Sequence, residues 1–419
     1  MRILIIHQYF LGETDGGGSR FNQFARYWTT RGHQVTVLAG TVNYATGKKS
    51  ERYRSRWVTE ERDESGARVL RCHVSKGYNR SYRGRLWGYL TFLASATWAG
   101  LFRAGKHHVI IASSPPLFVG ILGYIVSRLR RTPLVFEVRD LWPQFAVETG
   151  VLTNRWIIRL SYWLEKFLYR KAQRINVLTP AFRDLLLSRA VPEEKLVMIP
   201  NGADMDLFQP SGREEAVRRR YGWEGKFVVL YAGAHGRANA LEQVLDAALL
   251  LVNHDDILFA LVGDGMEKPH LEAQANALGL TNVQFIDAQA KSHMPEITYA
   301  ADVGLAVLKR TNGFKSVYPN KLFDYMACAR PVIVAIDGAA RSLVEKARAG
   351  MFVEPEDSAQ LRDAVLALYG DRDLAHQHGQ NGHAYVRDHF SRERLADQYL
   401  QFLSTLAEAE DPGPARASS

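Results

Sequence analysis

Cysteine is scarce in this sequence: only Cys72 and Cys328 occur among 419 residues. Two thiols cannot make the framework of several disulfides that stabilises small secreted domains, and so low a content fits a reducing compartment. No cluster of cysteine and histidine has the spacing of a zinc site. These absences exclude a chain held together by disulfides or zinc. They predict one held by hydrophobic cores, for which 47% hydrophobic residues is a typical globular value.

Long hydrophobic runs are also few. The first residues, MRILIIHQYF, place a single Arg2 before a short apolar run without a small-residue cleavage site, which is not the pattern of a signal peptide. Residues 86–102 carry no charge and reach the lower limit for a membrane-spanning helix. Pro115 and Pro116 divide a second uncharged run, 109–127, into a strand and a helix. We predict that both runs are buried elements of an α/β sheet rather than membrane spans.

Acidic residues are few in the first half of the chain. Residues 1–200 contain 31 Lys and Arg against 14 Asp and Glu, a balance of +17, and the remainder contains 22 against 30, a balance of −8. This asymmetry predicts that the first half meets an anionic surface or substrate, and nucleic acid and membrane are both candidates. Charge that serves solubility alone is the alternative.

Cations and aromatic residues occur together at two places in the basic half, a mixture typical of proteins that rest on lipid headgroups. The first cluster contains Arg80, Arg83, Arg85, Trp87, Tyr89 and Trp98, and the second contains Arg155, Trp156, Arg159, Trp163, Lys166, Arg170 and Lys171. We therefore expect peripheral contact with an anionic membrane through the N-terminal domain. No nucleic-acid-binding motif is recognisable, so we expect no nucleic acid partner.

Strand and helix patterns alternate along the chain, which is typical of a parallel α/β fold. Strands are expected at RILIIH, HQVTVLAG, VIIASS, PLVFEVRD and RINVLT in the first half, and at FVVLYAGA, ILFALVGDG, VQFIDA, VGLAVL and PVIVAI in the second. Two series of similar size predict two Rossmann-like domains, residues 1–200 and 201–390, which meet near the turn-rich PNG sequence. A helical tail at residues 391–408 lacks a following strand, and residues 409–419 are expected to be disordered.

The stretch from Pro319 to Ala335, PNKLFDYMACARPVIVA, combines a helix start with a buried strand. Asn320 is a suitable N-cap, and Lys321 and Asp324 then lie three residues apart on one helical face. Pro331 ends the helix before the β-branched run VIV. A helix N-terminus that presents a cation suits a phosphate, and a nearby carboxylate can accept hydrogen bonds from ribose hydroxyls. The stretch predicts a nucleotide site; an ordinary αβ unit with solvated charges is the alternative.

This stretch resembles the donor-site segment of the retaining nucleotide-sugar glycosyltransferases of family four, which have the GT-B fold of two Rossmann-like domains facing a cleft. In that family two glutamates bracket the segment, whereas here the second acidic position is Asp324 and the first is Ser316, a departure from the pattern. The resemblance implies that Lys321, Leu322 and the helix start bind the donor and that Asp324 faces its ribose. It also implies that the last helix, 391–408, packs back on the first domain.

A glycine loop, DGGGSR, follows the first expected strand. Its glycines allow backbone N–H groups to approach an anion closely. The GxGxxG spacing of a dinucleotide-binding loop is absent, and the second strand ends without an acidic residue for ribose, so nicotinamide binding is not expected. The loop resembles the phosphate-facing loop of the family, which implies donor contacts from Gly17 and Gly18. A plain tight turn is the alternative.

Arg139 and Asp140 end an expected strand, within the run FEVRDLWP. Charged residues at the carboxyl end of a parallel strand face the ligand crevice. The run resembles a signature of family-four enzymes that build bacterial surface polysaccharides, including the L-fucosamine-transferase-like branch. This resemblance implies that Arg139 holds a phosphate or acceptor anion, and that Asp140 orients the acceptor hydroxyl or stabilises charge on the sugar. A structural Arg–Asp pair is the alternative.

Turn residues of the second half complete the expected donor site. The run YAGAHGR places Gly233, His235 and Arg237 after one strand. Arg237 is expected to hold the donor diphosphate together with Lys321, although Asn239-Ala240 stands where relatives have Lys-Gly. A lone histidine is more often a surface residue than a catalyst, so His235 is assigned to donor binding only.

Two further turns resemble parts of the family's donor site. Gly263 lies in the run GDG after a strand, and Ala288 lies in IDAQ, where relatives hold the base by backbone contacts. Asp204-Met205-Asp206 looks like the DxD metal motif of other transferases, but it lies within NGADMDLF, which resembles the family's interdomain hinge. We therefore predict no metal and no cofactor beyond the nucleotide-sugar co-substrate.

The features together predict a GT-B enzyme, a hexosyl- or N-acetylhexosaminyl-type transferase, with Arg139, Asp140, Arg237 and Lys321 as catalytic residues. We expect it to move a sugar, with retained configuration, from a UDP-linked nucleotide-sugar to a polyprenyl-diphosphate-linked saccharide. The product is expected to enter a bacterial O-antigen, capsule or exopolysaccharide, and the enzyme to be cytoplasmic at the inner face of the cell membrane. One alternative is a nucleotide-sugar epimerase on the same fold. The other is a non-catalytic nucleotide-binding scaffold, which the departures at Ser316 and Asn239 favour.

Overall fold

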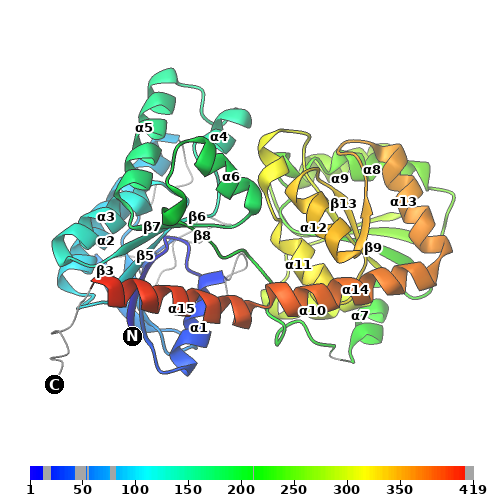
Figure 1. The fold of residues 1–419 in the computed structure, drawn as a ribbon. Helices are drawn as coiled ribbons and strands as arrows, with labels where there is room; N and C mark the ends of the chain where they lie inside the picture. The colour runs from blue at the N-terminus through cyan, green and yellow to red at the C-terminus, as the bar shows by residue number, and fades with distance from the viewer. Residues whose placement is uncertain (13–19, 43–52, 54–55, 76–81, 211, 411–419) are drawn as a thin grey trace. The chain divides into compact units, whose positions relative to one another are not determined.

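The computed structural model describes residues 1–12, 20–42, 53, 56–75, 82–210 and 212–410 (Figure 1). The chain forms two compact units, Met1–Pro200 with Glu393–Ser419, and Asn201–Arg392. Gly17 and Gly18 of the glycine loop lie outside the described residues, as does most of the tail expected to be disordered.

The first unit contains an eight-stranded sheet with the order β3-β4-β2-β1-β5-β6-β7-β8, in which β3 and β4 are the antiparallel pair. Every residue of β5 and β6 is buried, as is typical of parallel strands covered on both faces, and this burial explains their uninterrupted apolar sequences. The strands are β1 (Arg2–Ile6), β2 (Gln34–Gly40), β3 (Val58–Arg62), β4 (Arg68–Cys72), β5 (Val109–Ser114), β6 (Leu134–Val138), β7 (Arg174–Val177) and β8 (Leu196–Met198).

The helices of the first unit include the last helix of the chain, α15, which lies beside α1 (Figure 1). Tyr399 of α15 makes edge-to-face contacts with Phe24 and Trp28 of α1, and the Trp28 indole N–H donates to the Ala396 carbonyl at 2.9 Å. These buried side chains place α15 in the same hydrophobic core as β1 and β2. The helices are α1 (Arg20–Thr30), α2 (Tyr82–Phe102), α3 (Phe118–Arg130), α4 (Gln144–Glu148), α5 (Arg155–Lys171), α6 (Pro180–Ser188), the 3₁₀ turn η2 (Glu193–Lys195) and α15 (Arg392–Glu410).

Helix α2 contains the first uncharged run, which was predicted to be a buried element. Among the described residues, no helix is both long enough and apolar enough to cross a membrane. Phe92, Ala96 and Ala99 are buried, but Trp87 and Phe102 are exposed. The predicted burial is therefore found where α2 packs against α3 and the sheet.

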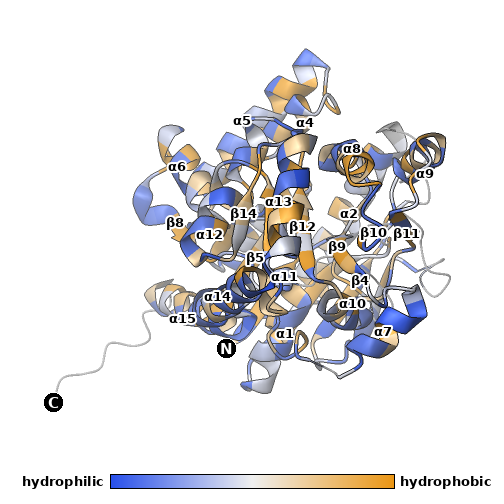
Figure 2. Ribbon diagram, turned by 90° about the vertical axis from the view of Figure 1, so that its right-hand side faces the viewer, coloured by the Kyte–Doolittle hydropathy of each residue, from blue (hydrophilic) through white to orange (hydrophobic). Residues whose placement is uncertain are grey.

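The second unit has a six-stranded sheet, parallel throughout, with the order β11-β10-β9-β12-β13-β14. Two hydrophobic cores lie on it, and Figure 2 shows the contrast between apolar strands and polar outer helices such as α7. The strands are β9 (Phe227–Ala232), β10 (Ile257–Val262), β11 (Val283–Ile286), β12 (Val303–Val307), β13 (Val332–Ala335) and β14 (Gly350–Phe352). The helices are α7 (Glu214–Tyr221), α8 (Glu242–Leu250), α9 (Lys268–Ala277), α10 (Met294–Ala300), α11 (Asn320–Ala327), α12 (Ala339–Ala347), α13 (Ser358–Gly370) and α14 (Arg372–Phe390), with 3₁₀ turns η3 (Arg237–Asn239), η4 (Lys291–His293) and η5 (Gly313–Ser316).

Four strands have no counterpart among the strands expected from the sequence. Strands β3 and β4, VTEER and RVLRC, carry charges that interrupt the apolar pattern. Strands β8 and β14 are only three residues long, and neither has a buried residue. Short or charged strands at or near a sheet edge lack the apolar run on which the other strands were recognised.

The two chain connections between the units run side by side within the second unit. The Ala203 amide donates to the Phe390 carbonyl at 3.1 Å, and the Arg392 amide donates to the Ala203 carbonyl at 2.7 Å. The segment that resembles an interdomain hinge is therefore hydrogen-bonded, through Ala203, to the backbone that leads into α15.

Candidate functional site

The site of the second unit lies where its strand order reverses. From β9 the chain adds β10 and β11 on one side and then returns to place β12 on the other side of β9. In open α/β sheets, ligands bind beyond the carboxyl ends of the strands at such a switch point. The loop after β9 contains Gly233, His235 and Arg237, so the topology places three predicted residues at this point.

Two glycines allow the loops after β9 and β10 to approach each other closely. Gly233 and Gly263 have φ angles of 152° and 154°, which side chains rarely adopt. A Cβ on Gly263 would lie 1.9 Å from the Gly233 carbonyl oxygen, and a Cβ on Gly233 would lie 2.9 Å from Lys321 Nζ. Glycine at 263 therefore allows the two loops to approach each other, and glycine at 233 leaves room for the Lys321 ammonium.

Lys321 lies in the first turn of α11, with its ammonium group against the ring of Tyr231. Its Nζ is 3.5 Å from the ring centroid and buried, although the residue as a whole is partly exposed. Within the described part of the chain, no hydrogen-bond partner reaches this nitrogen. Burial lowers the pKa of Lys321 to about 7. Since unsatisfied buried polar groups are rare, this nitrogen is the strongest single indication that the start of α11 suits an anionic ligand.

The start of α11 corrects one detail of the sequence analysis. Asn320 was expected to be the N-cap, but the cap position is Pro319 and has no side-chain hydrogen bond. The first turn of α11 therefore lacks a side-chain cap. The Leu322 amide donates to the Pro319 carbonyl at 3.1 Å, so the amides of Asn320 and Lys321 are the ones that can turn to a ligand. The helix also ends at Ala327, before Pro331.

His235 is buried beside Tyr231, the residue that contacts Lys321. Its ring lies 5.9 Å from that of Tyr231 and 6.2 Å from that of Phe285. Both ring nitrogens lack a hydrogen-bond partner among the residues that the structure describes. Burial, followed by the charges of Lys268 and Lys321, lowers the pKa of His235 to about 4, so the ring is neutral at pH 7 and can donate one hydrogen bond.

Arg237, the second predicted phosphate ligand, has a different environment. Its side chain is 82% exposed, and its Nε lies 2.9 Å from Glu267 Oε1. Asn239, which replaces the lysine of relatives, donates from Nδ2 to the Ala234 carbonyl at 2.9 Å. The substituted position therefore stabilises the loop rather than presenting a charge.

Asp324, the predicted ribose ligand, pairs with a residue that sequence reasoning missed. Its Oδ2 lies 2.7 Å from Lys291 Nζ, and this ammonium also lies 4.8 Å from the Phe208 ring centroid. Lys291 follows β11 at the same sheet edge, which is the signal that could have found it. One carboxylate oxygen of Asp324 is thus engaged, and an incoming diol would have to share it or use the other.

The remaining predicted donor residues differ in which of their atoms a ligand can contact. Leu322 is fully buried in a hydrophobic core, so only its main chain can contact a ligand. Ala288 is exposed after the end of β11. The Ser316 hydroxyl, at the departure from the family pattern, donates to the Gly313 carbonyl at 2.6 Å.

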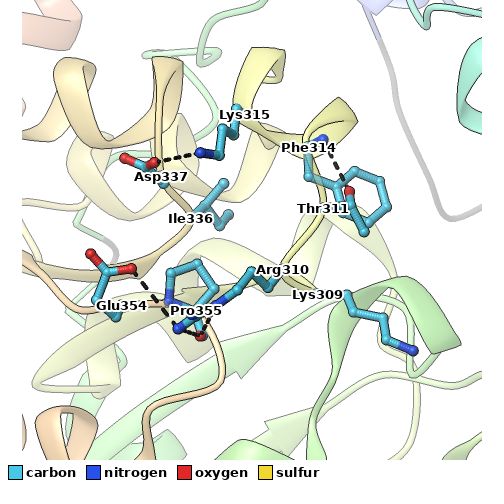
Figure 3. A pocket seen from close by; sticks show the side chains of 9 residues that line it. All are labelled: Lys309, Arg310, Thr311, Phe314, Lys315, Ile336, Asp337, Glu354 and Pro355. Carbon is cyan, nitrogen blue, oxygen red and sulfur yellow. Dashed lines mark hydrogen bonds and ion pairs between the residues drawn. The ribbon is translucent and has the colours of Figure 1, made fainter. Parts of the chain in front are cut away.

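A cavity of about 150 Å³ lies beyond the carboxyl ends of β12, β13 and β14 (Figure 3). Lys315 Nζ lies 3.2 Å from Asp337 Oδ2, and Arg310 donates to the Pro355 carbonyl at 2.7 Å. The cavity is lined by Lys309, Arg310, Thr311, Phe314, Lys315, Ile336, Asp337, Glu354 and Pro355, none of which was a predicted site residue. The amide of Lys309 donates to the Ala238 carbonyl at 2.9 Å, which links the cavity wall to the loop of Arg237.

In the first unit, Arg139 and Asp140 follow β6 and lie near the end of β1. Arg139 Nη1 is 3.3 Å from His7 Nε2. Burial, and then the charge of Arg139, lowers the pKa of His7 well below its usual value. Asp140 is exposed to water, yet desolvation by surrounding protein atoms raises the pKa of its carboxyl, against the opposing effect of Arg139. The structure keeps these two residues at the carboxyl edge of the sheet, where they were expected.

A buried ion pair that was not predicted joins the segments around these residues. Arg20 Nε lies 3.1 Å from Glu137 Oε1, and the side chains are 2% and 0% exposed. Asn176 Nδ2 donates to Glu137 Oε2 at 3.1 Å, and Arg20 Nη2 donates to the Ile199 carbonyl at 2.8 Å. The cluster connects Arg20, the last residue of the DGGGSR run, with the strand that leads to Arg139 and with Ile199, which follows β8.

The two acidic residues of the DxD-like sequence, Asp204 and Asp206, differ in exposure. Asp204 is buried, and its Oδ1 accepts a hydrogen bond from the Leu207 amide at 3.3 Å, whereas Asp206 is exposed. Over the described ranges, no group of three or more histidine, cysteine and acidic residues could hold a metal ion.

Family models match both units of the chain. The model described as a glycosyl transferase 4-like domain matches residues 15–202, and the model described as glycosyl transferases group 1 matches residues 226–371.

Proteins similar to this chain match it over nearly its whole length. The Escherichia coli (strain K12) protein WcaI, named as a colanic acid biosynthesis glycosyl transferase, is 24% identical over 410 residues, which are 96% of this chain and 99% of that protein. Sucrose-phosphate synthase from Thermosynechococcus elongatus has a TM-score of 0.77 at 19% identity, over 97% of this chain and 99% of its own. Anabaena HepE, solved in complex with UDP-glucose, has a TM-score of 0.73 at 20% identity, over 97% of this chain and 100% of its own. The expected fold class, two Rossmann-like units of the GT-B type, is confirmed.

Proposed function

We propose that this chain, which belongs to the glycosyltransferases that join a 4-like domain to a group 1 domain, transfers a sugar from a nucleotide-sugar to a lipid-linked saccharide. The observation that carries the proposal is the buried Lys321 ammonium at the switch point of the second sheet, which contacts the Tyr231 ring but has no hydrogen-bond partner among the described residues. A nucleoside diphosphate supplies the negative charge that this nitrogen lacks. UDP is our proposed nucleotide, supported by the similarity of the fold to HepE, which was solved with UDP-glucose.

We assign the diphosphate and the ribose of the donor to different residues. Lys321, the N–H groups of the first turn of α11 and the neutral His235 ring bind the diphosphate. Arg237 reaches it from the exposed side of the β9 loop by leaving Glu267, and Asp324, held by Lys291, accepts a hydrogen bond from ribose. Main-chain groups near Gly233, Gly263, Ala288 and Leu322 line the rest of the site.

Transfer breaks the bond between the anomeric carbon and the diphosphate oxygen, and forms a bond to the acceptor oxygen. The transition state carries positive charge on the sugar and extra negative charge on the leaving diphosphate. Cations fixed in a desolvated site stabilise that negative charge without having to reorganise. In this proposal Arg139 holds the acceptor's phosphate and Asp140 orients the acceptor hydroxyl. Gly17 and Gly18, to which the family resemblance gives donor contacts, lie outside the described residues. We infer that the anomeric configuration is retained.

The acceptor and its location are inferred from the first unit. Its excess of positive charge suits a polyprenyl-diphosphate-linked saccharide at an anionic membrane. Cys72 and Cys328 are free and buried, which fits a cytoplasmic protein at the inner face of the membrane. By similarity to WcaI, the product would be a bacterial surface polysaccharide, and the L-fucosamine-transferase-like branch with a hexosyl or N-acetylhexosaminyl donor is our finer proposal.

The first test is a panel of nucleotides followed by an assay of transfer. A ligand present at 100 times its Kd raises the free energy of unfolding by about 2.7 kcal/mol, which a melting experiment detects. The nucleotide-sugar identified in this way is incubated with lipid-linked saccharides, with and without excess EDTA. We expect transfer that EDTA leaves intact, because we propose a metal-independent enzyme. Near-complete loss of transfer that Mg²⁺ or Mn²⁺ restores would contradict metal independence.

The same assay separates the alternatives. Conversion of the donor sugar without any acceptor would identify an epimerase. Tight nucleotide binding without transfer to any lipid-linked acceptor would favour the non-catalytic scaffold, which the departures at Ser316 and Asn239 support.

Affinity for a nucleotide-sugar is expected to fall as the pH rises above 7. The diphosphate binds the charged form of Lys321, whose pKa is about 7 in the free protein, so binding above pH 7 requires uptake of a proton. From the fraction of Lys321 that is charged, we predict about fivefold weaker binding at pH 8 than at pH 7. Above pH 8 the affinity should fall by nearly tenfold for each pH unit. His235 does not titrate in this range because its pKa is about 4. Calorimetry in buffers of different ionisation enthalpy measures both the affinity and the proton uptake, and binding that is independent of pH would contradict the assignment.

A further inference from the structure

Helix α5 exposes a row of large apolar side chains. Trp156, Leu160 and Trp163 follow one another at intervals of four and three residues, so they lie on one face of the helix. They are 78%, 62% and 62% exposed. Single exposed hydrophobic residues are normal on a protein surface, whereas a row of three with two tryptophans marks a surface that contacts something else.

A row of cations runs beside this apolar row. Arg155, Arg159, Lys166 and Arg170 recur at intervals of four, seven and four residues, and all are exposed. Arg155 directly precedes Trp156, and Arg159 directly precedes Leu160, so the two rows are neighbours along the helix axis. A helix that lies flat on a surface therefore presents both rows at once.

The acidic residue of α5 is turned away from this face. Glu165 is buried, accepts from the Tyr169 hydroxyl at 2.9 Å and lies 2.9 Å from Arg189 Nη1. This pairing holds the opposite side of the helix against the rest of the unit. The exposed face of α5 therefore carries positive charge only.

The N-terminus of the helix is also fixed in place. The Asn154 side chain accepts hydrogen bonds from the amides of Trp156 and Ile157 at 3.0 and 3.2 Å. The first tryptophan thus belongs to a capped helix rather than to a frayed end. Little conformational entropy remains to be lost when such a preformed surface binds its partner.

We propose that this face of α5 docks the protein on an anionic lipid surface. The apolar row enters the boundary between headgroups and acyl chains, where tryptophan is favoured, and the cations contact headgroup phosphates. The exposed charged side chains of α5 are all cations, which are complementary to anionic lipid, although the pKa of Tyr162 of α5, raised by burial, is raised further by the nearby exposed Glu148 of α4. This inference names the surface for the membrane contact proposed above and rests on that proposal, but it does not depend on which sugar is transferred.

The test is cosedimentation of the full chain with vesicles that contain no acceptor. Vesicles of phosphatidylcholine with phosphatidylglycerol should bind the protein, and vesicles of phosphatidylcholine alone should bind it far more weakly. Replacing Arg155 and Arg159 with glutamine should weaken binding about 30-fold, since each cation near such a surface contributes about fivefold. High salt should also weaken vesicle binding by the parent chain, because it screens the attraction between these cations and the anionic headgroups.

The apolar row is tested with the triple variant Trp156→Ala, Leu160→Ala, Trp163→Ala. The matched control replaces three exposed apolar residues of the second unit, Leu249, Leu250 and Leu374, with alanine. We expect the α5 variant to lose vesicle binding and the control to retain it, with both melting like the parent. If the α5 variant binds vesicles as well as the parent does, the proposal is overturned. It is also overturned if the α5 variant loses only self-association, because the row would then be a contact between copies of the chain.

Transfer assays show whether a negative result concerns the membrane surface on α5 or the proposed transferase activity. With a water-soluble acceptor, the α5 variant should turn over like the parent, and with an acceptor embedded in anionic vesicles it should be slower. Absence of transfer by the parent chain would reject the enzyme but leave the vesicle result as it stands.

Discussion

Replacing Lys321 with methionine is expected to lower turnover by about 10²–10³-fold, as the loss of a preorganised charged contact to a developing anion does in other enzymes. The same substitution should leave the ligand-free protein as stable as the parent or more stable. The reason is that the buried ammonium has no hydrogen-bond partner in the described chain, so its contact with the Tyr231 ring does not make up for the water that its charge loses. This combination of lost activity and retained stability is the signature of a ligand site. Steady-state kinetics and thermal melting with and without nucleotide measure the two effects.

The control for this experiment is Lys346→Met. Lys346 is an exposed lysine near the end of α12, and its removal should change neither turnover nor nucleotide binding. Arg237→Ala tests the second proposed cation, which in the ligand-free protein is bound to Glu267. If the variants at Lys321 and Arg237 both keep full turnover, the diphosphate does not bind at this edge of the sheet.

Replacing Glu137 with alanine is expected to destabilise the first unit by about 3–5 kcal/mol. The substitution leaves Arg20 as an uncompensated charge, 2% exposed, in the interior of that unit. It also removes one of the two acceptors of Asn176 Nδ2, the other being the Ile199 carbonyl. Urea unfolding measures the loss, and the transition that belongs to the first unit should move to lower urea with an unchanged slope.

Two comparisons make this second prediction specific. Glu60 pairs with Arg68 at 2.7 Å on the surface, and Glu60→Ala should cost no more than about 1 kcal/mol. The double variant Arg20→Met, Glu137→Leu should recover much of the lost stability, because apolar residues often replace a buried ion pair without net cost. A loss below 1 kcal/mol for Glu137→Ala would mean that the cluster contributes little to the stability of the unit.

The strands could be predicted where parallel pairing buries both of their faces. Runs such as VIIASS and VGLAVL are apolar for that reason, and they became β5 and β12. The strands that were missed, such as β3 and the three-residue β14, lack this pattern. The start of α11 was likewise predictable, since a turn followed by a helix depends on residues close together in the sequence, although the N-cap was not Asn320.

The partners of the site residues could not be predicted in this way. Asp324 and Lys291 are separated by 33 residues, and Arg20 and Glu137 by 117. No local pattern relates such pairs, because they meet only when the carboxyl ends of different strands come together. The burial of Lys321 against Tyr231 is another example, since the lysine lies on α11 and the ring belongs to β9.

The amino-acid sequence was sufficient for the α/β class with two Rossmann-like units, since hydrophobic period and turn chemistry act over a few residues. The nucleotide segment stays a prediction. Which charged groups are buried, paired or left without a partner followed from the packing of the chain. Lys321 is chemically an ordinary lysine, and its lowered pKa comes from the loss of water around its nitrogen. Glu165 and Arg155 belong to the same helix, yet one is buried and paired while the other is exposed, because the rest of the unit covers only one side of α5.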